Sequence, residues 1–178
     1  MAKVIDEYTL EEITRAHEIN AGVFIPFVIA RLASNKRQRE ALLTVSLRDA
    51  ENRETQRQLH LRWAAESIPE QPLAVPEKVI TELAACGVAC VVLARYTSLS
   101  IALMSNEGDR FDYRVSDGSN DYGLEISGTL TGETEYRARS KARQLRTNPH
   151  RVGGYVVVAK FATKEVICAF HYFEGDKK

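Results

Sequence analysis

The sequence predicts an α+β protein, in which helices and strands follow one another without a regular repeat. Two observations support this class. Apolar residues recur at helical spacing in some segments, while others alternate between apolar and polar residues over short runs bounded by turn-forming residues. A chain of 178 residues is long enough for one well-filled core with an N-terminal elaboration.

The first predicted elements are two helices. Thr9-Leu-Glu-Glu12 has the form of a capping box, in which a hydroxyl and a carboxylate each bond an unpaired backbone N–H at a helix start. We therefore expect a helix over residues 10–19. A second apolar helix should cover residues 23–32, with Pro26 in its first turn. The two helices are expected to pack together as a hairpin.

Residues 34–63 combine a basic loop with strand-like segments. Residues 34–40 form a solvated basic stretch, residues 41–47 alternate as in a strand, and residues 49–58 are highly polar. Leu59, Leu61 and Trp63 alternate with polar residues as on a half-buried strand, but Leu59 and Trp63 would also suit a helix. Both interpretations of residues 59–63 stay open.

Three prolines mark the joint between two parts of the chain. Pro69, Pro72 and Pro76 each disfavour helix for the preceding residue. The sequence therefore predicts a helical and mixed N-terminal extension over residues 1–70 and an α/β core over residues 76–178.

The second part begins with a helix and continues with strands. Pro76 suits the first turn of a helix, and Gly87 is a plausible stop, after which residues 88–95 either extend the helix or turn back as a strand. Three strand-like runs follow at 99–104, 111–115 and 123–127, and their turn-rich connections predict a meander. A charged helix over residues 133–145 and two strands at 155–161 and 166–173 complete the order.

The composition narrows the function classes. Lysine plus arginine equals aspartate plus glutamate at 24 each, so any nucleic-acid partner must be bound by a local basic patch. We expect no membrane segment and no secretion signal, which predicts a cytoplasmic protein. The three cysteines have no CxxC spacing and the four histidines no ligand spacing, so a structural zinc site is not expected.

The segment 123–129 contains the strongest chemical signal, because Glu125 interrupts an apolar strand. Strand side chains alternate between faces, so Glu125 and Ser127 should point away from the side of Leu124. In a hairpin between residues 111–115 and 123–127, Asp112 falls opposite Glu125, with Asp109 as the reserve. Two adjacent carboxylates repel unless a cation lies between them.

The order of helix, three-strand meander, helix and two strands, with Glu125-Ile-Ser127 on the third strand, resembles the PD-(D/E)XK nuclease superfamily. The resemblance covers about residues 76–173 and implies a restriction-endonuclease-like core with an N-terminal helical extension. It further implies that Asp112 and Glu125 are the metal ligands for Mg²⁺, or for Mn²⁺, and that the metal activates a water for phosphodiester hydrolysis.

The resemblance departs from its pattern at Ser127, which stands where the superfamily has lysine. A hydroxyl cannot supply a fixed positive charge. Some members carry the cation on the following helix, and Lys141 is then the third catalytic residue. Arg137, Lys141 and Gln144 recur at helical spacing and would form one polar face toward the acids.

The leading hypothesis is thus a divergent Mg²⁺-dependent endonuclease acting on DNA or RNA. Its phosphate contacts are expected from four arginines. Those arginines are Arg137, Arg143, Arg146 and Arg151.

Two alternatives stay open. One is a catalytically inactive nuclease-like module, or an unrelated α+β module, that binds nucleic acid or a partner protein. In the other, Glu125 is an ordinary strand charge, exposed or paired with Arg114. The N-terminal helices provide either a homodimer or partner surface or part of the core. The residues in question are Phe24, Ile25, Phe27 and Val28.

Overall fold

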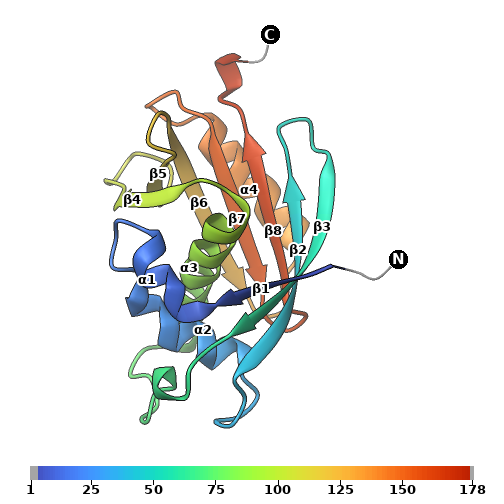
Figure 1. Ribbon diagram of the computed structural model, residues 1–178. Coiled ribbons are helices and arrows are strands. Elements are labelled where there is room, and N and C mark those ends of the chain that lie inside the picture. Colours follow the sequence, from blue (N-terminus) through green and yellow to red (C-terminus); the bar gives the residue numbers. More distant parts are fainter. Residues whose placement is uncertain (1–3, 177–178) are drawn as a thin grey trace.

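The computed structural model describes residues 4–176, which fold into four α-helices and one eight-stranded mixed sheet (Figure 1). The α+β class is therefore confirmed. The helices are α1 (Ile13–Ala16), α2 (Ile25–Leu32), α3 (Glu77–Tyr96) and α4 (Thr134–Arg146). The strands are β1 (Ile5–Thr9), β2 (Glu40–Arg48), β3 (Glu54–Arg62), β4 (Ser100–Met104), β5 (Tyr113–Ser116), β6 (Asp121–Thr129), β7 (Gly154–Lys160) and β8 (Glu165–His171).

The strands lie in the order β1-β3-β2-β8-β7-β6-β5-β4. The predicted meander is present, since β4, β5 and β6 pair antiparallel in sequence order. After α4 the chain returns as β7, parallel to β6, and β8 then runs antiparallel beside β7. Strand β2 pairs parallel with β8, so strands from both sides of the proline-rich joint share one sheet.

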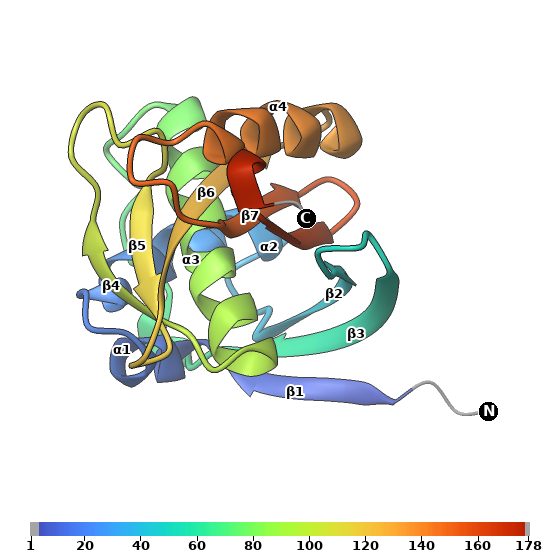
Figure 2. The same ribbon diagram turned by 90° about the horizontal axis from the view of Figure 1, so that it is seen from above.

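Helix α3 lies at the centre of the fold. It packs against β6 and β7 on one face of the sheet, while α4 packs against β6, β7 and β8 on the other face. In Figure 1, α3 lies in front of the sheet and α4 behind it. Seen from above, the strands curve around α3 from β4 to β1 (Figure 2). The sheet and the helices on this face together enclose the main hydrophobic core.

Helix α3 is also the one helix among the described residues whose length and hydropathy would allow a membrane span. Its apolar window is 61% buried inside the protein, and the core helix of a soluble protein has the same features. Length and composition are therefore weak evidence for a membrane helix.

Of the two alternatives for residues 88–95, the structure shows the extended helix, because α3 continues without a break through Gly87 to Tyr96. The glycine serves packing. A Cβ atom at Gly87 would lie 2.3 Å from Cγ2 of Val28 and 3.0 Å from Cβ of Phe24, on the neighbouring helix segment. The missing side chain allows α2 to approach α3 closely.

The predicted helix over residues 10–19 is much shorter than expected. A 3-10 turn at Leu10–Glu12 leads into α1, which ends at Ala16, and Thr9 makes no side-chain capping bond. The capping-box prediction is therefore wrong. The helix stops because the next residues pair with β4: Ile101 N–H donates to Nδ1 of His17, and Glu18 N–H donates to the carbonyl of Ile101, each at 3.0 Å.

Helix α2 lies within the predicted segment, with Pro26 in its first turn. The predicted hairpin packing is wrong, because α1 and α2 both pack mainly on α3. Three of the four apolar residues considered for a partner surface, Phe24, Ile25 and Val28, are buried in the core, and Phe27 is partly buried against it. A partner contact at these helices stays a prediction and would need their exposed faces.

The open segment around Leu59 and Leu61 is part of β3, which starts as early as Glu54. Its first half is polar because residues 54–57 are exposed, and the alternation becomes visible only where Leu59 and Leu61 enter the core. The sequence of β1 shows no such alternation of apolar and polar residues, because this strand lies at the sheet edge, where it pairs with β3.

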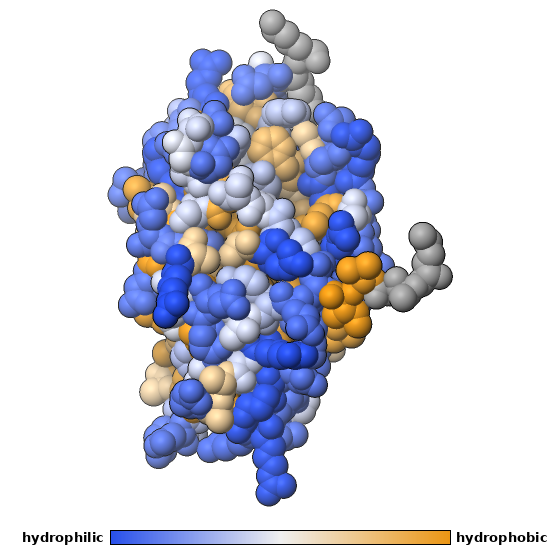
Figure 3. Space-filling model, in the orientation of Figure 1, coloured by the Kyte–Doolittle hydropathy of each residue, from blue (hydrophilic) through white to orange (hydrophobic). Residues whose placement is uncertain are grey.

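The face of the molecule in Figure 3 is mostly hydrophilic. An apolar patch lies beside the start of β1, where Val4 is 71% and Ile5 53% exposed. Exposed apolar side chains therefore lie at the start of the edge strand β1.

Candidate active site

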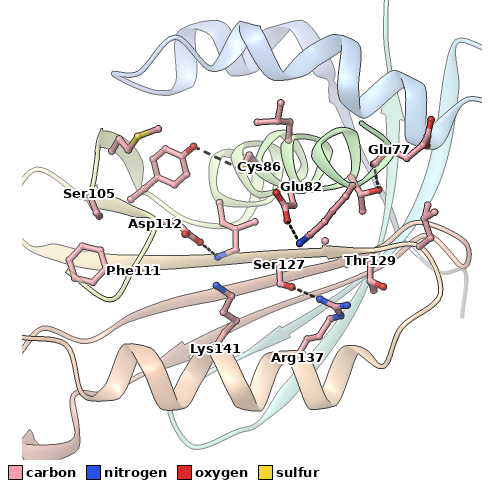
Figure 4. Close-up of a pocket in the computed structure, with 18 of the residues that line it drawn as sticks. Glu77, Glu82, Cys86, Ser105, Phe111, Asp112, Ser127, Thr129, Arg137 and Lys141 are labelled. Carbon is pink, nitrogen blue, oxygen red and sulfur yellow. Dashed lines mark hydrogen bonds and ion pairs between the residues drawn. The ribbon is translucent and has the colours of Figure 1, made fainter. Parts of the chain in front are cut away.

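A cleft of about 1010 Å³ lies between α3, the loop from β4 to β5, the end of β6 and the start of α4 (Figure 4). Its lining combines carboxylates, hydroxyls and apolar side chains with three basic side chains, which are Lys78, Arg137 and Lys141. Figure 4 shows Lys141 and Arg137 reaching up from α4 towards β6, with Asp112 on the other side of that strand. Three of the predicted site residues, Asp112, Arg137 and Lys141, therefore face one cleft.

Asp112 and Glu125 are held side by side by the pairing of β5 and β6. The register places Tyr113 opposite Leu124, and Asp112 N–H donates to the carbonyl of Leu124 at 2.8 Å. The side chain of Asp112 is fixed as well, because its Oδ2 accepts a 2.7 Å hydrogen bond from the Ile126 N–H. These two hydrogen bonds therefore hold Asp112, just before β5, opposite Glu125 on β6.

Glu125 is buried, with 1% of its residue surface exposed, and it is neither a solvated charge nor a partner of Arg114. Its Oε2 accepts a hydrogen bond of 2.5 Å from Nζ of Lys141 on α4. Burial, the largest cause, and the nearby charge of Asp112 raise the pKa of Glu125 to about 7, although Lys141 acts in the opposite direction. The carboxyl group therefore changes charge near neutral pH.

Ser127, the next residue on this face of β6, is contacted by the second cation. NH1 of Arg137 donates to Oγ of Ser127 at 3.2 Å. Arg137 and Lys141 are four residues apart on one face of α4, so one helix surface delivers a positive charge to each of the two β6 positions. The predicted polar face of this helix does look towards the acids.

The loop that carries Asp112 is braced by Asp109, the reserve ligand. Asp109 Oδ1 pairs with Nε2 of His150 at 2.7 Å, and its Oδ2 accepts from the Asn106 N–H at 2.9 Å. These hydrogen bonds, that from His150 first, lower the pKa of Asp109. Asp109 therefore tightens its own loop. Sequence reasoning missed this role, because His150 lies far along the chain, between α4 and β7.

Two further carboxylates line the cleft from α3, and sequence reasoning missed both. Glu77 pairs with Arg31 at 2.6 Å, and Glu82 lies 3.9 Å from Lys78. Their only sequence signal was the charged face of an otherwise apolar helix. Both carboxylates thus have basic neighbours other than the cations of α4.

The donor set fits a divalent cation that is held partly by its substrate. Among residues 4–176 no group of three or more His, Cys, Asp or Glu side chains is placed to hold a metal ion. Mg²⁺, however, is commonly bound by one or two carboxylates together with water and substrate phosphates. Asp112 and Glu125 provide two such carboxylates, and their mutual repulsion, visible in the pKa of Glu125, favours a cation between them.

The other predicted arginines lie elsewhere. Arg143 and Arg146 line a separate hollow of about 630 Å³ together with Arg48 and Arg139, away from the two acids. The guanidinium of Arg151 lies over the ring of Phe173, 5.6 Å from its centroid. Of the four arginines, only Arg137 faces the cleft.

Comparison with known proteins places no further constraint on this site. No protein-family model, curated protein or solved structure matches the chain.

Proposed function

We propose that this chain is a metal-dependent nuclease of the PD-(D/E)XK type, in which Lys141 replaces the lysine missing at position 127. The observation that carries the proposal is the convergence of Asp112, Glu125 and Lys141 from three different elements. A buried acid with a raised pKa, a second acid and a lysine beside a large cleft are the features expected of a functional site.

The order of elements supports the same proposal. Helix α3, strands β4, β5 and β6, helix α4 and strand β7 follow the core order of the superfamily, and these four strands are neighbours in the sheet. Asp112 stands at the entry to the second of these strands and Glu125 on the third. These positions support the proposal, because the resemblance implies one acid on the second strand and one on the third.

The chemistry divides between the chain and its proposed metal. A divalent cation held by Asp112 and Glu125 would supply Lewis-acid activation of water and of the scissile phosphate. Lys141, 2.5 Å from Glu125, keeps this carboxylate oriented and brings a positive charge to the place where negative charge develops in the transition state. Arg137, anchored on Ser127, is placed to bind a phosphate oxygen.

The charge balance explains how the site would stay ready to bind metal. With a pKa of about 7, about half of the Glu125 carboxyl groups carry a proton near neutral pH, and a bound cation would displace that proton. Lys141 lowers this proton affinity, because its ammonium favours the ionised carboxylate. The lysine on α4 therefore compensates part of the penalty for burying Glu125.

Purified protein with Mg²⁺ or Mn²⁺ tests the proposal. It should nick plasmid DNA or degrade single-stranded DNA or RNA, EDTA should stop the reaction, and Glu125→Gln should abolish it. Glu66→Gln, a matched change at an exposed glutamate, should leave the rate unchanged. If the wild type cleaves none of these substrates, the proposed nuclease activity is refuted.

A second candidate is a nuclease-like module that binds nucleic acid without cutting it. The observation that favours it is that Lys141 already neutralises Glu125, while position 127 carries no cation. Such a module should bind labelled oligonucleotides equally well with EDTA or Mg²⁺ and leave them intact. Metal-dependent cleavage would exclude it.

A further inference from the structure

A second hollow, of about 350 Å³, opens beside the acid site along the first turns of α4. It shares Ser127, Arg137 and Lys141 with the main cleft, and Lys141 in turn contacts Glu125. The volume falls within the range of about 300–1,000 Å³ that is usual for small-molecule sites. The rest of its lining is Gly132, Glu133, Tyr136, Ser140 and Gln144.

Arg137 stands where the two hollows meet. Among the described residues, the one hydrogen-bond partner of its guanidinium is Ser127 Oγ, which accepts from NH1. Gly132 makes room for the rest of the guanidinium, because a Cβ there would lie 3.2 Å from Nε and 3.5 Å from NH2 of Arg137. The remaining N–H donors suit a phosphate oxygen, which arginine binds through two parallel hydrogen bonds.

Tyr136 supplies an aromatic surface at the rim of the hollow. It is 67% exposed and makes no ring contact with another aromatic side chain in residues 4–176. Exposed aromatic side chains beside a phosphate-binding cation are typical of sites that stack nucleobases. Ser140 and Gln144 add polar groups within the same hollow, and Glu133 is the one carboxylate in its lining.

We infer that this hollow binds an unpaired nucleotide, with its phosphate on Arg137 and its base against Tyr136, and that the substrate is single-stranded nucleic acid. The inference rests on the proposed function and specifies its substrate. A nucleobase can enter this hollow only when it is neither stacked on its neighbours nor paired with another base. The chain has no net charge, so nucleic-acid binding depends on local basic groups such as Arg137.

Fluorescence anisotropy tests this inference, with labelled oligothymidylate and oligouridylate against a mixed-sequence DNA duplex of equal length. EDTA is present throughout, so that cleavage cannot interfere. We expect the single strands to bind more tightly than the duplex. Tyr136→Ala should weaken single-strand binding about tenfold, because one base–aromatic stack contributes roughly 1–3 kcal/mol. Tyr136→Phe should retain the affinity, and Tyr172→Ala, at another exposed tyrosine, should not alter it.

A second variant addresses the cavity itself. A Cβ at Gly132 would lie 2.7 Å from Oγ1 of Thr129 and 3.2 Å from Nε of Arg137, so Gly132→Val should displace the guanidinium and weaken single-strand binding, in a protein whose circular dichroism matches that of the wild type. Equal or tighter binding of the duplex, no binding of either, or an unchanged affinity of Tyr136→Ala would overturn the inference. Failure of the nuclease proposal is distinguishable, since it appears as absent cleavage with single-strand binding and its Tyr136 dependence intact.

Discussion

Nζ of Lys141 lies 2.5 Å from Oε2 of Glu125, although sixteen residues separate the two along the chain. Glu125 is buried on β6 and Lys141 comes from the helix that covers that strand. Lys141 brings to Glu125 a positive charge, which the hydroxyl of Ser127 cannot supply. Burial and the charge of Asp112 raise the pKa of this carboxyl group, whereas Lys141 lowers it, and the first two predictions follow from the resulting value of about 7.

The stability of the protein should depend on the ionisation of Glu125. The pKa of this group rises from 4.5 to about 7 on folding, so the folded state binds the proton more tightly than the unfolded state. Its contribution to the free energy of unfolding is therefore complete below about pH 4.5 and falls by up to about 3 kcal/mol as the pH rises to about 7. Urea unfolding across this range measures the slope.

The variant Glu125→Gln isolates this contribution, because glutamine cannot ionise. It should flatten the fall in stability between about pH 4.5 and 7 and should unfold at higher urea concentration than the wild type above about pH 7. A slope unchanged by the substitution would show that other groups cause it.

Metal-dependent cleavage should increase with pH as Glu125 loses its proton. Below the pKa of about 7, the rate should rise about tenfold per pH unit, and it should level off above. Because a bound cation favours the carboxylate, raising the Mg²⁺ concentration should move the midpoint lower. A rate that stays flat from about pH 5 to 8 would contradict the assignment of Glu125 as a ligand.

The catalytic lysine should function either at position 141 on α4 or at position 127 on β6. Lys141→Ala should lower the cleavage rate by about 100-fold, the size expected when a transition-state charge partner is removed. Adding Ser127→Lys in the same protein should recover much of that loss, since the lysine would then stand where the superfamily has it. Arg139→Ala, on another face of α4, serves as the control. No recovery in a folded double variant would count against the resemblance.

Low pH should weaken the hydrogen bonds by which His17 joins the N-terminal segment to the core. The buried ring donates from Nε2 to the carbonyl of Cys90 and accepts at Nδ1 from Ile101 N–H, which requires its neutral form. Burial lowers the pKa of His17 below 6.5. Its contribution to stability is thus present above about pH 6.5 and is lost as the pH falls below that value.

His17→Gln provides the comparison. It should lower the free energy of unfolding by roughly 1–3 kcal/mol near neutral pH, because buried hydrogen-bonding groups lose their partner. It should also lessen the loss of stability below about pH 6.5, measured by urea unfolding. An unaltered acid response would assign that response to other groups.

Gly128 should be essential for the packing of β6 on α3. A Cβ at this position would lie 2.5 Å from the backbone carbonyl oxygen of Thr81 and 2.9 Å from Cβ of Ala85, so the strand and the helix would have to separate. We expect Gly128→Ala to destabilise the protein by about 1–3 kcal/mol in thermal or urea unfolding. Gly175→Ala, whose nearest contact is a Phe173 ring carbon at 3.2 Å, should have little effect.

The elements of the second half could be predicted from local patterns, because each had a clear period and clear ends. The bounds of the three-strand meander, the charged helix α4 and the two last strands all lie within two residues of the predicted ones. The N-terminal half was harder. The polar start of β3 and the edge strand β1 carry little apolar alternation, and Gly87 resembles a helix stop although it serves helix packing.

The sequence by itself determined which chemical groups stand at which positions of the strands and of α4. The spacing of Asp112 and Glu125 in a hairpin, and of Arg137 and Lys141 on one helix face, follows from the periods of two and 3.6 residues. Only the tertiary structure decided that this helix face meets β6 at Glu125 and Ser127, and that Arg143, Arg146 and Arg151 point elsewhere. The reason is that periodicity fixes directions within one element, whereas the meeting of two elements depends on close packing between residues far apart in the chain.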